Sequence, residues 1–385
     1  MKKSKISLLT IILVLSFSAV LSCVPMIAFA EDSNSTDQYK EALSSYDFSC
    51  FDELGDSANE VLKQLGIDDF DYTKITELDA ETCAKVLWDL ASKNLTEPLG
   101  GAVTILCFTV LSAFLSGFST NRLFSDSSVY STAASLVIAV IISVQCADTI
   151  SVACTTIEVC SDFIYAFFPV FMVIITVSGG ALTSISTNTL LLSLAQGLNV
   201  LASNIFVPLI NCFLALSICS GIRTELNIDG ALRVIKRVLI GLISFSAGAF
   251  VAVLSIKTAV ASRADALGLR SLRFAINSVV PVIGSAISEG LLSIQSYSSL
   301  IKSSVGIVGI IGVAALFLPA MLNVVGWRIS ISISLAVSEI FEDRSVSKML
   351  RAFGDAFLLL NVVLILAMVT TIISIGILIA AKTTA

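Results

Sequence analysis

Histidine is absent from this chain of 385 residues, and charged residues make up only 14% of it. Without histidine the chain lacks the most common general base, metal ligand and neutral-pH switch of proteins, which excludes most familiar hydrolase and zinc chemistries. The shortage of charge, with 56% hydrophobic residues and a mean hydropathy of +0.95, does not fit a water-soluble domain of this size. The sequence therefore predicts an all-α, polytopic integral membrane protein without a cofactor.

Motifs of catalysis and of metal binding are also missing. The sequence has no Cys-x-x-Cys unit, no Gly-rich phosphate loop and no Ser-Lys or Asp-Asp protease arrangement. We expect no catalytic and no metal-binding residues. The cysteines are interpreted as small apolar residues. Disulfide bonds between Cys50 and Cys83 and between Cys154 and Cys160 remain an open alternative. A net charge of −6 without a basic arm argues against a nucleic-acid partner.

The N-terminus has the composition of a secretory signal. Three lysines at positions 2, 3 and 5 precede an apolar stretch over residues 6–20 and the small residues Ala28-Phe29-Ala30. We expect residues 1–30 to be a cleaved signal peptide, with an uncleaved anchor as the alternative. Residues 31–97 hold seventeen acidic residues against five lysines. They predict a soluble, helical, extracytoplasmic segment that serves as a cap or docking arm.

Intervals without charge locate the membrane spans in residues 98–385, because about 20 apolar residues cross the hydrocarbon. Single crossings are predicted over residues 98–121, 127–147, 238–256, 303–327 and 356–381. The uncharged run 163–222 has room for three crossings, or for two and a re-entrant piece, with joints at Gly179-Gly180 and near residues 196–199. This gives seven or eight helices, with Asp148 to Asp162 as an outer loop. The basic residues near 122, 223–237 and 328–351 then share the cytoplasmic side.

Residues 257–302 do not fit this pattern and form the first candidate functional segment. They combine charge with helix-breaking residues at Lys257, Arg263, Asp265, Arg270, Arg273, Pro281, Gly284 and Glu289. The pieces 274–288 and 290–301 are each too short to cross a bilayer, so we expect a re-entrant or interfacial element. Two interpretations remain open, an interfacial helix that binds lipid phosphates and a hydrated site that lines a pathway or binds a partner.

A second candidate lies in the uncharged run, where Asn204 and Asn211 share a helix face on either side of Pro208. These residues predict either a polar pathway lining or hydrogen bonds between helices. Prolines at 169 and 208, and at 281 and 319, have similar spacings, which is compatible with a duplicated transporter-like unit or with chance. Glycines at 306, 309 and 312 form a smooth strip for close packing, within the chain or in a homo-oligomer.

Four features of the sequence are distinctive: the run KTAVASRADALGLRSLRFAINSVVPVIGSAISEG, the Gly306-x-x-Gly309 strip, the LFLPAML stretch around Pro319 and the long apolar C-terminal helix. Together they resemble the stage III sporulation protein AE family of endospore-forming Firmicutes. The order of signal, acidic segment and spans is also similar. The sequence SEIFEDRS after Trp327 departs from the family, which has a proline there. The resemblance implies a multi-pass protein of the mother-cell membrane around the forespore, with its N-terminal segment extracytoplasmic. It also implies a complex with a secretion-type ATPase, small membrane proteins and ring-forming subunits.

Two function classes follow from these observations. The first is a non-enzymatic subunit of a transenvelope channel or secretion-like complex between mother cell and forespore, needed for late forespore development. The second is a stand-alone secondary transporter whose broken helices bind a small solute.

Overall fold

The protein is a bundle of long helices in a computed structural model that describes residues 43–67, 80–119, 127–177, 182–222, 228–279, 284–341 and 344–380. All regular elements in these ranges are helical, which confirms the all-α prediction. The elements in chain order are η1 (Ser49–Leu54), α3 (Gly55–Gln64), α5 (Ala80–Ser119), α6 (Ser127–Val177), α7 (Leu182–Leu201), η2 (Ala202–Phe206), α8 (Val207–Ile222), α9 (Asp229–Val279), α10 (Gly284–Ile340) and α11 (Arg344–Ala380).

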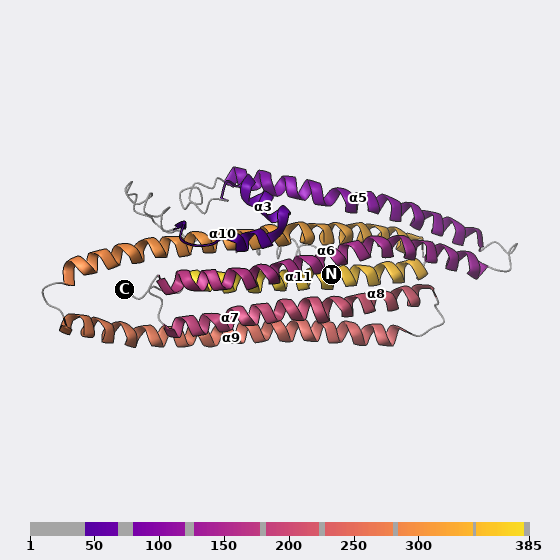
Figure 1. The fold of residues 1–385 in the computed structure, drawn as a ribbon. Helices are drawn as coiled ribbons and strands as arrows, with labels where there is room; N and C mark the ends of the chain where they lie inside the picture. The colour runs from indigo at the N-terminus through magenta and orange to yellow at the C-terminus, as the bar shows by residue number, and fades with distance from the viewer. Residues whose placement is uncertain are drawn as a thin grey trace.

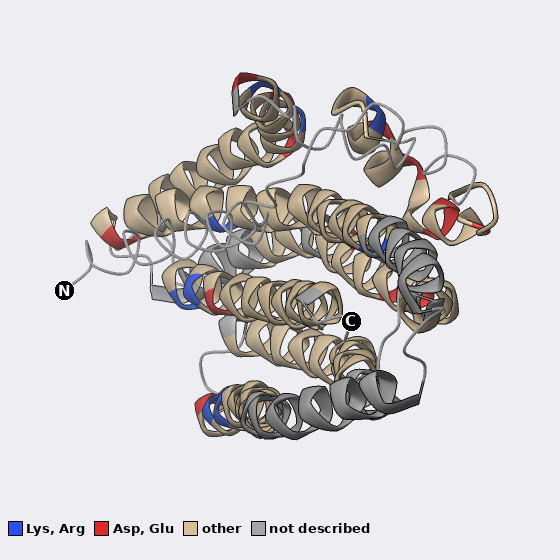
Figure 2. Cartoon of the chain, turned by 90° about the vertical axis from the view of Figure 1, so that its left-hand side faces the viewer, with Lys and Arg blue, Asp and Glu red and all other residues tan. Residues whose placement is uncertain are grey.

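The helices run back and forth along one axis (Figure 1). Within the described ranges, six of them are long and apolar enough to cross a membrane, with α7, η2 and α8 counting as one rod. The end-on view shows how little charge they carry along their length (Figure 2). The helices are also long: α10 has 57 residues, or about 85 Å at 1.5 Å per residue, against about 30 Å of hydrocarbon. The bundle therefore extends well beyond a bilayer.

The six spans are fewer than the seven or eight predicted, and the difference lies in α6 and α7. The prediction of an outer loop from Asp148 to Asp162 is wrong, because α6 runs through this segment without a break. Between Ser127 and Phe168 the sequence has neither glycine nor proline, so three acidic residues do not interrupt the helix. The predicted joint at residues 196–199 is also wrong, since α7 continues to Leu201. The joint at Gly179-Gly180 falls between α6 and α7, outside the described residues.

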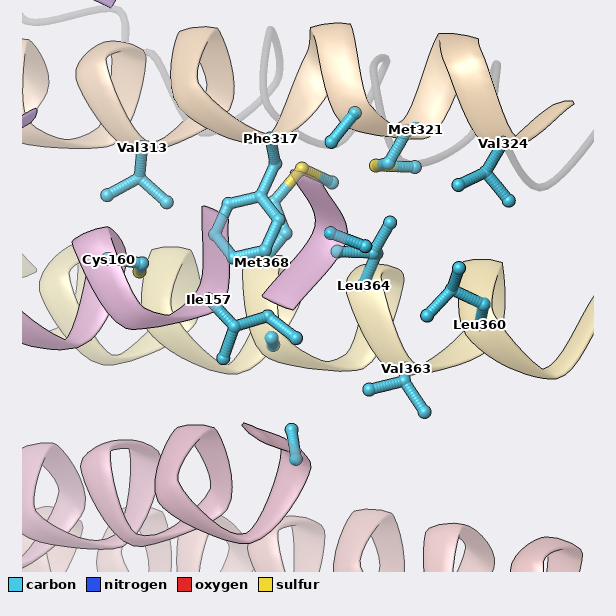
Figure 3. Close-up of a cluster of buried hydrophobic side chains, with 14 of the residues drawn as sticks. Ile157, Cys160, Val313, Phe317, Met321, Val324, Leu360, Val363, Leu364 and Met368 are labelled. Carbon is cyan, nitrogen blue, oxygen red and sulfur yellow. The ribbon is translucent and has the colours of Figure 1, made fainter. Parts of the chain in front are cut away.

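Helix α11 lies at the centre of the bundle. It contacts α10 most extensively and also α6, α7, α8 and α9. Its side chains Leu360, Leu364 and Met368 face Phe317 and Val324 of α10, with side chains of α6 beside them (Figure 3). The charge-free part of α11, residues 356–380, fits this position, because a helix surrounded by other helices can be apolar on all sides.

Close packing of α10 depends on its glycines, as the Gly306, Gly309 and Gly312 strip predicts. A Cβ at Gly306 would collide with Ile379 of α11, and a Cβ at Gly312 would lie 2.6 Å from Leu54 Cδ1. At Gly309 the nearest atom would be Cζ of Phe167, at 3.3 Å. The strip thus joins α10 to three different elements, which confirms its packing role.

The rod of α7 and α8 widens into a π-helical turn at η2, just before Pro208. Val207 N–H donates to the carbonyl of Ala202, five residues earlier. Proline has no N–H, and its ring pushes against the carbonyl four residues earlier, so a wider turn before Pro208 relieves the conflict. The rod therefore stays continuous across this proline.

Helix α5 runs across the predicted domain boundary at residues 97 and 98. Ser330 Oγ donates to the Pro98 carbonyl at 2.8 Å, and the Pro98 ring lies against Gly326. The proline is thus one of the residues through which α5 packs on α10. Cys50, Cys83, Cys154 and Cys160 form no disulfide bonds in the structure. The last two lie six residues apart on one helix, about 9 Å along its axis, which is too far for a disulfide.

Candidate functional site

The predicted segment 257–302 is divided between the end of α9 and the start of α10. The positions Lys257, Arg263, Asp265, Arg270 and Arg273 lie on the α9 backbone, and α10 begins at Gly284. The side chains of residues 257–299, including Glu289, and the whole of Pro281 lie outside the described part of the chain. A re-entrant or interfacial role for this segment stays a prediction.

The second predicted site lies on the outer surface of the rod. Asn204, Pro208 and Asn211 are all exposed, and thus share one face as expected. The Nδ2 of Asn204 donates to the Val200 carbonyl at 3.0 Å and to Ser203 Oγ at 3.2 Å. These bonds stay within one turn of the helix, so Asn204 does not connect neighbouring helices.

The opposite side of the same rod carries a buried polar cluster. Gln196 Nε2 donates to Ser161 Oγ at 2.6 Å, and Asn199 Nδ2 lies 3.5 Å from Thr371 Oγ1 and 3.8 Å from Cys160 Sγ. These bonds join α7 to α6 and α11, as is typical of polar residues between membrane helices. The side-chain oxygens of Gln196 and Asn199 have no hydrogen-bond partner among the described residues.

Acidic residues on the exposed side of α6 form the most unusual feature of the bundle. Glu158 and Asp162 lie one turn apart and are both exposed. No lysine or arginine among the described side chains forms an ion pair with either carboxylate, although Cys154 Sγ donates to Glu158 at 3.5 Å. An unpaired aspartate at the centre of a bilayer costs about 2.5–3.5 kcal/mol. The pair does not suit a surface that faces hydrocarbon.

The N-terminal elements η1 and α3 dock beside these residues, between α6 and α10. Phe51 packs edge-on against Phe163 and Phe167, with ring centroids 5.4 and 5.8 Å apart. Leu54 is 1% exposed and lies on Gly312 of α10. The buried positions share one side of the segment, since Phe51, Leu54, Ala58 and Val61 follow the helical spacing of three and four residues. The acidic segment thus has an apolar face that fits the bundle.

The outward side of η1 and α3 is acidic. Asp52, Glu53, Asp56 and Glu60 are exposed there, as are Glu158 and Asp162 on α6. The sequence alone suggested an acidic arm but not its docking site. The spacing of Phe51, Leu54, Ala58 and Val61 was the available signal for the docking.

Comparison with known proteins assigns the chain to a family. A sequence model of stage III sporulation protein AE matches residues 69–382, which is most of the chain and includes all six long helices. The chain belongs to the stage III sporulation protein AE family. Stage III sporulation protein AE of Bacillus subtilis (strain 168) is 27% identical over 215 residues. That match covers 55% of this chain and 53% of the relative, about half the length of each. No solved structure matches the chain.

In this member of the stage III sporulation protein AE family, ion pairs cluster at one end of the bundle. Lys236 of α9 binds Asp355 of α11 at 2.5 Å, and Lys348 binds Asp229 at 2.6 Å. At the same end Arg351 binds Glu339 at 2.6 Å. The two predicted cytoplasmic basic regions, 223–237 and 328–351, thus meet at a single end, and their side of the membrane stays a prediction.

The described side chains of this family member offer no metal site. No group of three or more Cys, Asp or Glu residues among them is placed to bind an ion. A shallow hollow lined by Ile150, Ile210, Leu214 and Leu360 has apolar walls and no room for a water-sized molecule. It is therefore not a small-molecule site.

Proposed function

We propose that this chain is a non-enzymatic membrane subunit of a transenvelope channel or secretion-like complex between mother cell and forespore, required for late forespore development. The observation that carries the proposal is the family match over residues 69–382, which includes the whole six-helix bundle. The length of the helices adds support, because a bundle that extends past both bilayer surfaces offers protein surface to partners on each side.

The orientation belongs to the same proposal. With the N-terminal segment outside, the end that holds Lys236, Lys348 and Arg351 faces the mother-cell cytoplasm, in line with the preference of basic residues for that side. Arg233 and Arg237 are exposed at this end, and neither forms an ion pair with a side chain that the structure describes. They offer positive charge to a cytoplasmic partner such as a secretion-type ATPase, and ring-forming subunits would bind on the outer side.

Deletion of the gene in its own host tests the proposal. We expect sporulation to stop after engulfment and late forespore gene expression to be lost, with both restored by a second copy of the gene. Normal spore yield in the deletion strain rules the proposal out. Reporter fusions after Arg237 and after Arg273 test the orientation, and a cytoplasmic signal at the second position contradicts it.

A stand-alone transporter is the second candidate function. The observation in its favour is the buried pair Gln196 and Asn199, whose unpartnered oxygens lie one turn before a π-helical turn. Uptake of a solute by the purified protein in liposomes, lost on Asp265→Asn or Asn199→Leu, would favour this function. Spore formation without the gene would agree with a transporter but not with the channel subunit.

A further inference from the structure

We propose that the outward side of the α7–α8 rod binds the same side of a second copy of this chain, with Asn211 hydrogen-bonded to its counterpart. We name this surface the rod face. Its exposed residues include Gly197, Asn204, Pro208, Asn211, Cys212 and Cys219. Helices α6, α9 and α11 contact the rod on its other sides, so the rod face is the side that the described part of the chain leaves uncovered.

The sequence of the rod itself places the rod face at membrane depth. Residues 182–222 contain no Lys, Arg, Asp or Glu, and Thr189–Ser220 has the length and hydropathy of a membrane span. A crossing of about 20 residues centred on that span covers residues 195–214, and thus both asparagines. Any crossing of this length that starts between residues 185 and 203 includes Asn204. This placement does not depend on where the other helices cross the bilayer.

Polar groups on the rod face lack partners within the described part of the chain. The exposed side chain of Asn211 forms no hydrogen bond with a described residue, and neither does Oδ1 of Asn204. Pro208 has no N–H, so the carbonyl of Asn204 also loses its usual α-helical donor. Hydrocarbon cannot hydrogen-bond with these groups, and leaving them unpaired there is costly. The rod face therefore needs a polar partner.

The rest of the rod face does not suit water as that partner. Apart from Ser193, Asn204 and Asn211, its exposed residues are glycine, proline, cysteine or aliphatic. A Cβ at Gly197 would meet no atom within 4 Å, which leaves the helix backbone open to close approach. Small residues combined with a few polar ones are typical of contacts between membrane helices. The rod face therefore fits a protein helix better than water or acyl chains.

A second copy of the chain is the occupant that fits best. Two copies in one membrane have the same orientation, so a twofold axis along the membrane normal brings the rod face to its own counterpart. An asparagine amide is both donor and acceptor, which makes Asn211 complementary to itself, and such a pair fixes the register of two parallel helices. The rod face has no charge that would repel a copy. The exposed side of α9 is less suitable, because Arg233 and Arg237 would meet their own counterparts.

Disulfide cross-linking in membranes from sporulating cells tests the contact, because the rod face carries two natural exposed thiols, Cys212 and Cys219. Two cysteines form a disulfide only when their Cα atoms come within about 7 Å. We expect mild oxidation with copper phenanthroline to give a covalent dimer of the chain, detected by non-reducing electrophoresis and identified by mass spectrometry. Cys212→Ser combined with Cys219→Ser should abolish the dimer. Cys107→Ser, which removes an exposed thiol of α5, should leave it intact.

Three results would overturn the proposal. The first is the absence of a dimer through Cys212, Cys219 or a third thiol introduced by Ala215→Cys. The second is a dimer that persists without these thiols and is lost in Cys107→Ser. The third is a disulfide from the rod face to a different protein, which would assign the surface to another subunit. Rapid reaction of Cys212 with a membrane-impermeant maleimide, without any dimer, would assign it to water.

Energy transfer between copies of the full chain tests the hydrogen bond between the asparagines. Two preparations, fused to different fluorescent proteins, are mixed in liposomes over a range of protein-to-lipid ratios. Asn211→Leu should weaken dimerisation by about threefold to tenfold, whereas Asn211→Gln, which keeps the amide, should retain most of the affinity. Ser244→Leu makes a similar change on the exposed side of α9 and should have no effect. Dimerisation that Asn211→Leu leaves unchanged overturns the pairing. The dimer does not depend on the proposed channel role, since it would form whatever the effect of the gene deletion on sporulation.

Discussion

Helices α6 and α9 have the same length, 51 residues, and run in the same direction through the bundle (Figure 1). They distribute charge in opposite ways. Helix α9 has its charges in both terminal parts and a charge-free centre, while the charges of α6 are the three acidic residues Asp148, Glu158 and Asp162 in its middle. Similar length and hydropathy therefore do not imply similar surroundings, since the position of the charge along the helix determines which surface can meet lipid.

The largest expected effect concerns the docked segment that covers part of α6. Leu54→Asp removes a fully buried side chain and places a charge on Gly312, which should weaken docking by about 3–5 kcal/mol. Burial raises the pKa of the Cys50 thiol to about 11, so at pH 8 this thiol is almost entirely protonated and unreactive.

Cys50 gives the measurement for this variant. Once the segment undocks and its thiol returns to an ordinary pKa, alkylation at pH 8, followed by peptide mass spectrometry, should be about 100-fold faster. Asp56→Ala, at an exposed position of α3, should leave the rate unchanged. A protected Cys50 in Leu54→Asp would show that η1 does not depend on the contact with Gly312.

A charge exchange between the two long helices tests the comparison directly. Phe245→Asp places a carboxylate on the exposed apolar side of α9, within its charge-free stretch, where we expect it to cost about 2.5–3.5 kcal/mol and to reduce the amount of protein in the membrane. Asp162→Asn on α6 should leave that amount unchanged. Quantitative immunoblots of membrane fractions measure both, and equal levels of the two variants would remove the distinction between the helices.

A smaller effect is expected from added volume at two glycines. Gly306→Val forces a side chain against Ile379 of α11 and Phe171 of α6, which should destabilise the bundle by about 1–3 kcal/mol. Gly248→Val makes the same change on α9, where a Cβ meets no atom within 4 Å. Thermal stability in detergent compares the two variants. If Gly248→Val lowers it as much as Gly306→Val does, the outer side of α9 is packed against protein and not against lipid.

The helices themselves could be predicted from the sequence. The stretches 238–256, 303–327 and 356–381 lie within α9, α10 and α11, because an interval without charge and of bilayer length has few alternatives to a spanning helix. The segment from Asp148 to Asp162 was misread because charge was taken as the sign of a loop. The lack of glycine and proline in that part of α6 was the stronger signal.

The docking of the N-terminal segment could not be predicted in the same way. Helical spacing shows that Phe51, Leu54 and Ala58 share an apolar face, but it does not identify the surface that receives it. Leu54 and Gly312 are far apart in the sequence, and the strip of glycines on α10 would accept any helix. The partners of Gln196 and Asn199 on α6 and α11 are long-range contacts of the same kind.

The length of α9 has a mechanical consequence. From Lys257 to Val279 the helix continues for about 35 Å beyond its charge-free stretch. A straight helix of this length acts as a lever, so a tilt of about 10° in the membrane part would move its far end by about 6 Å. A small rearrangement among the spanning helices can thus become a displacement as wide as a single turn of helix outside the bilayer.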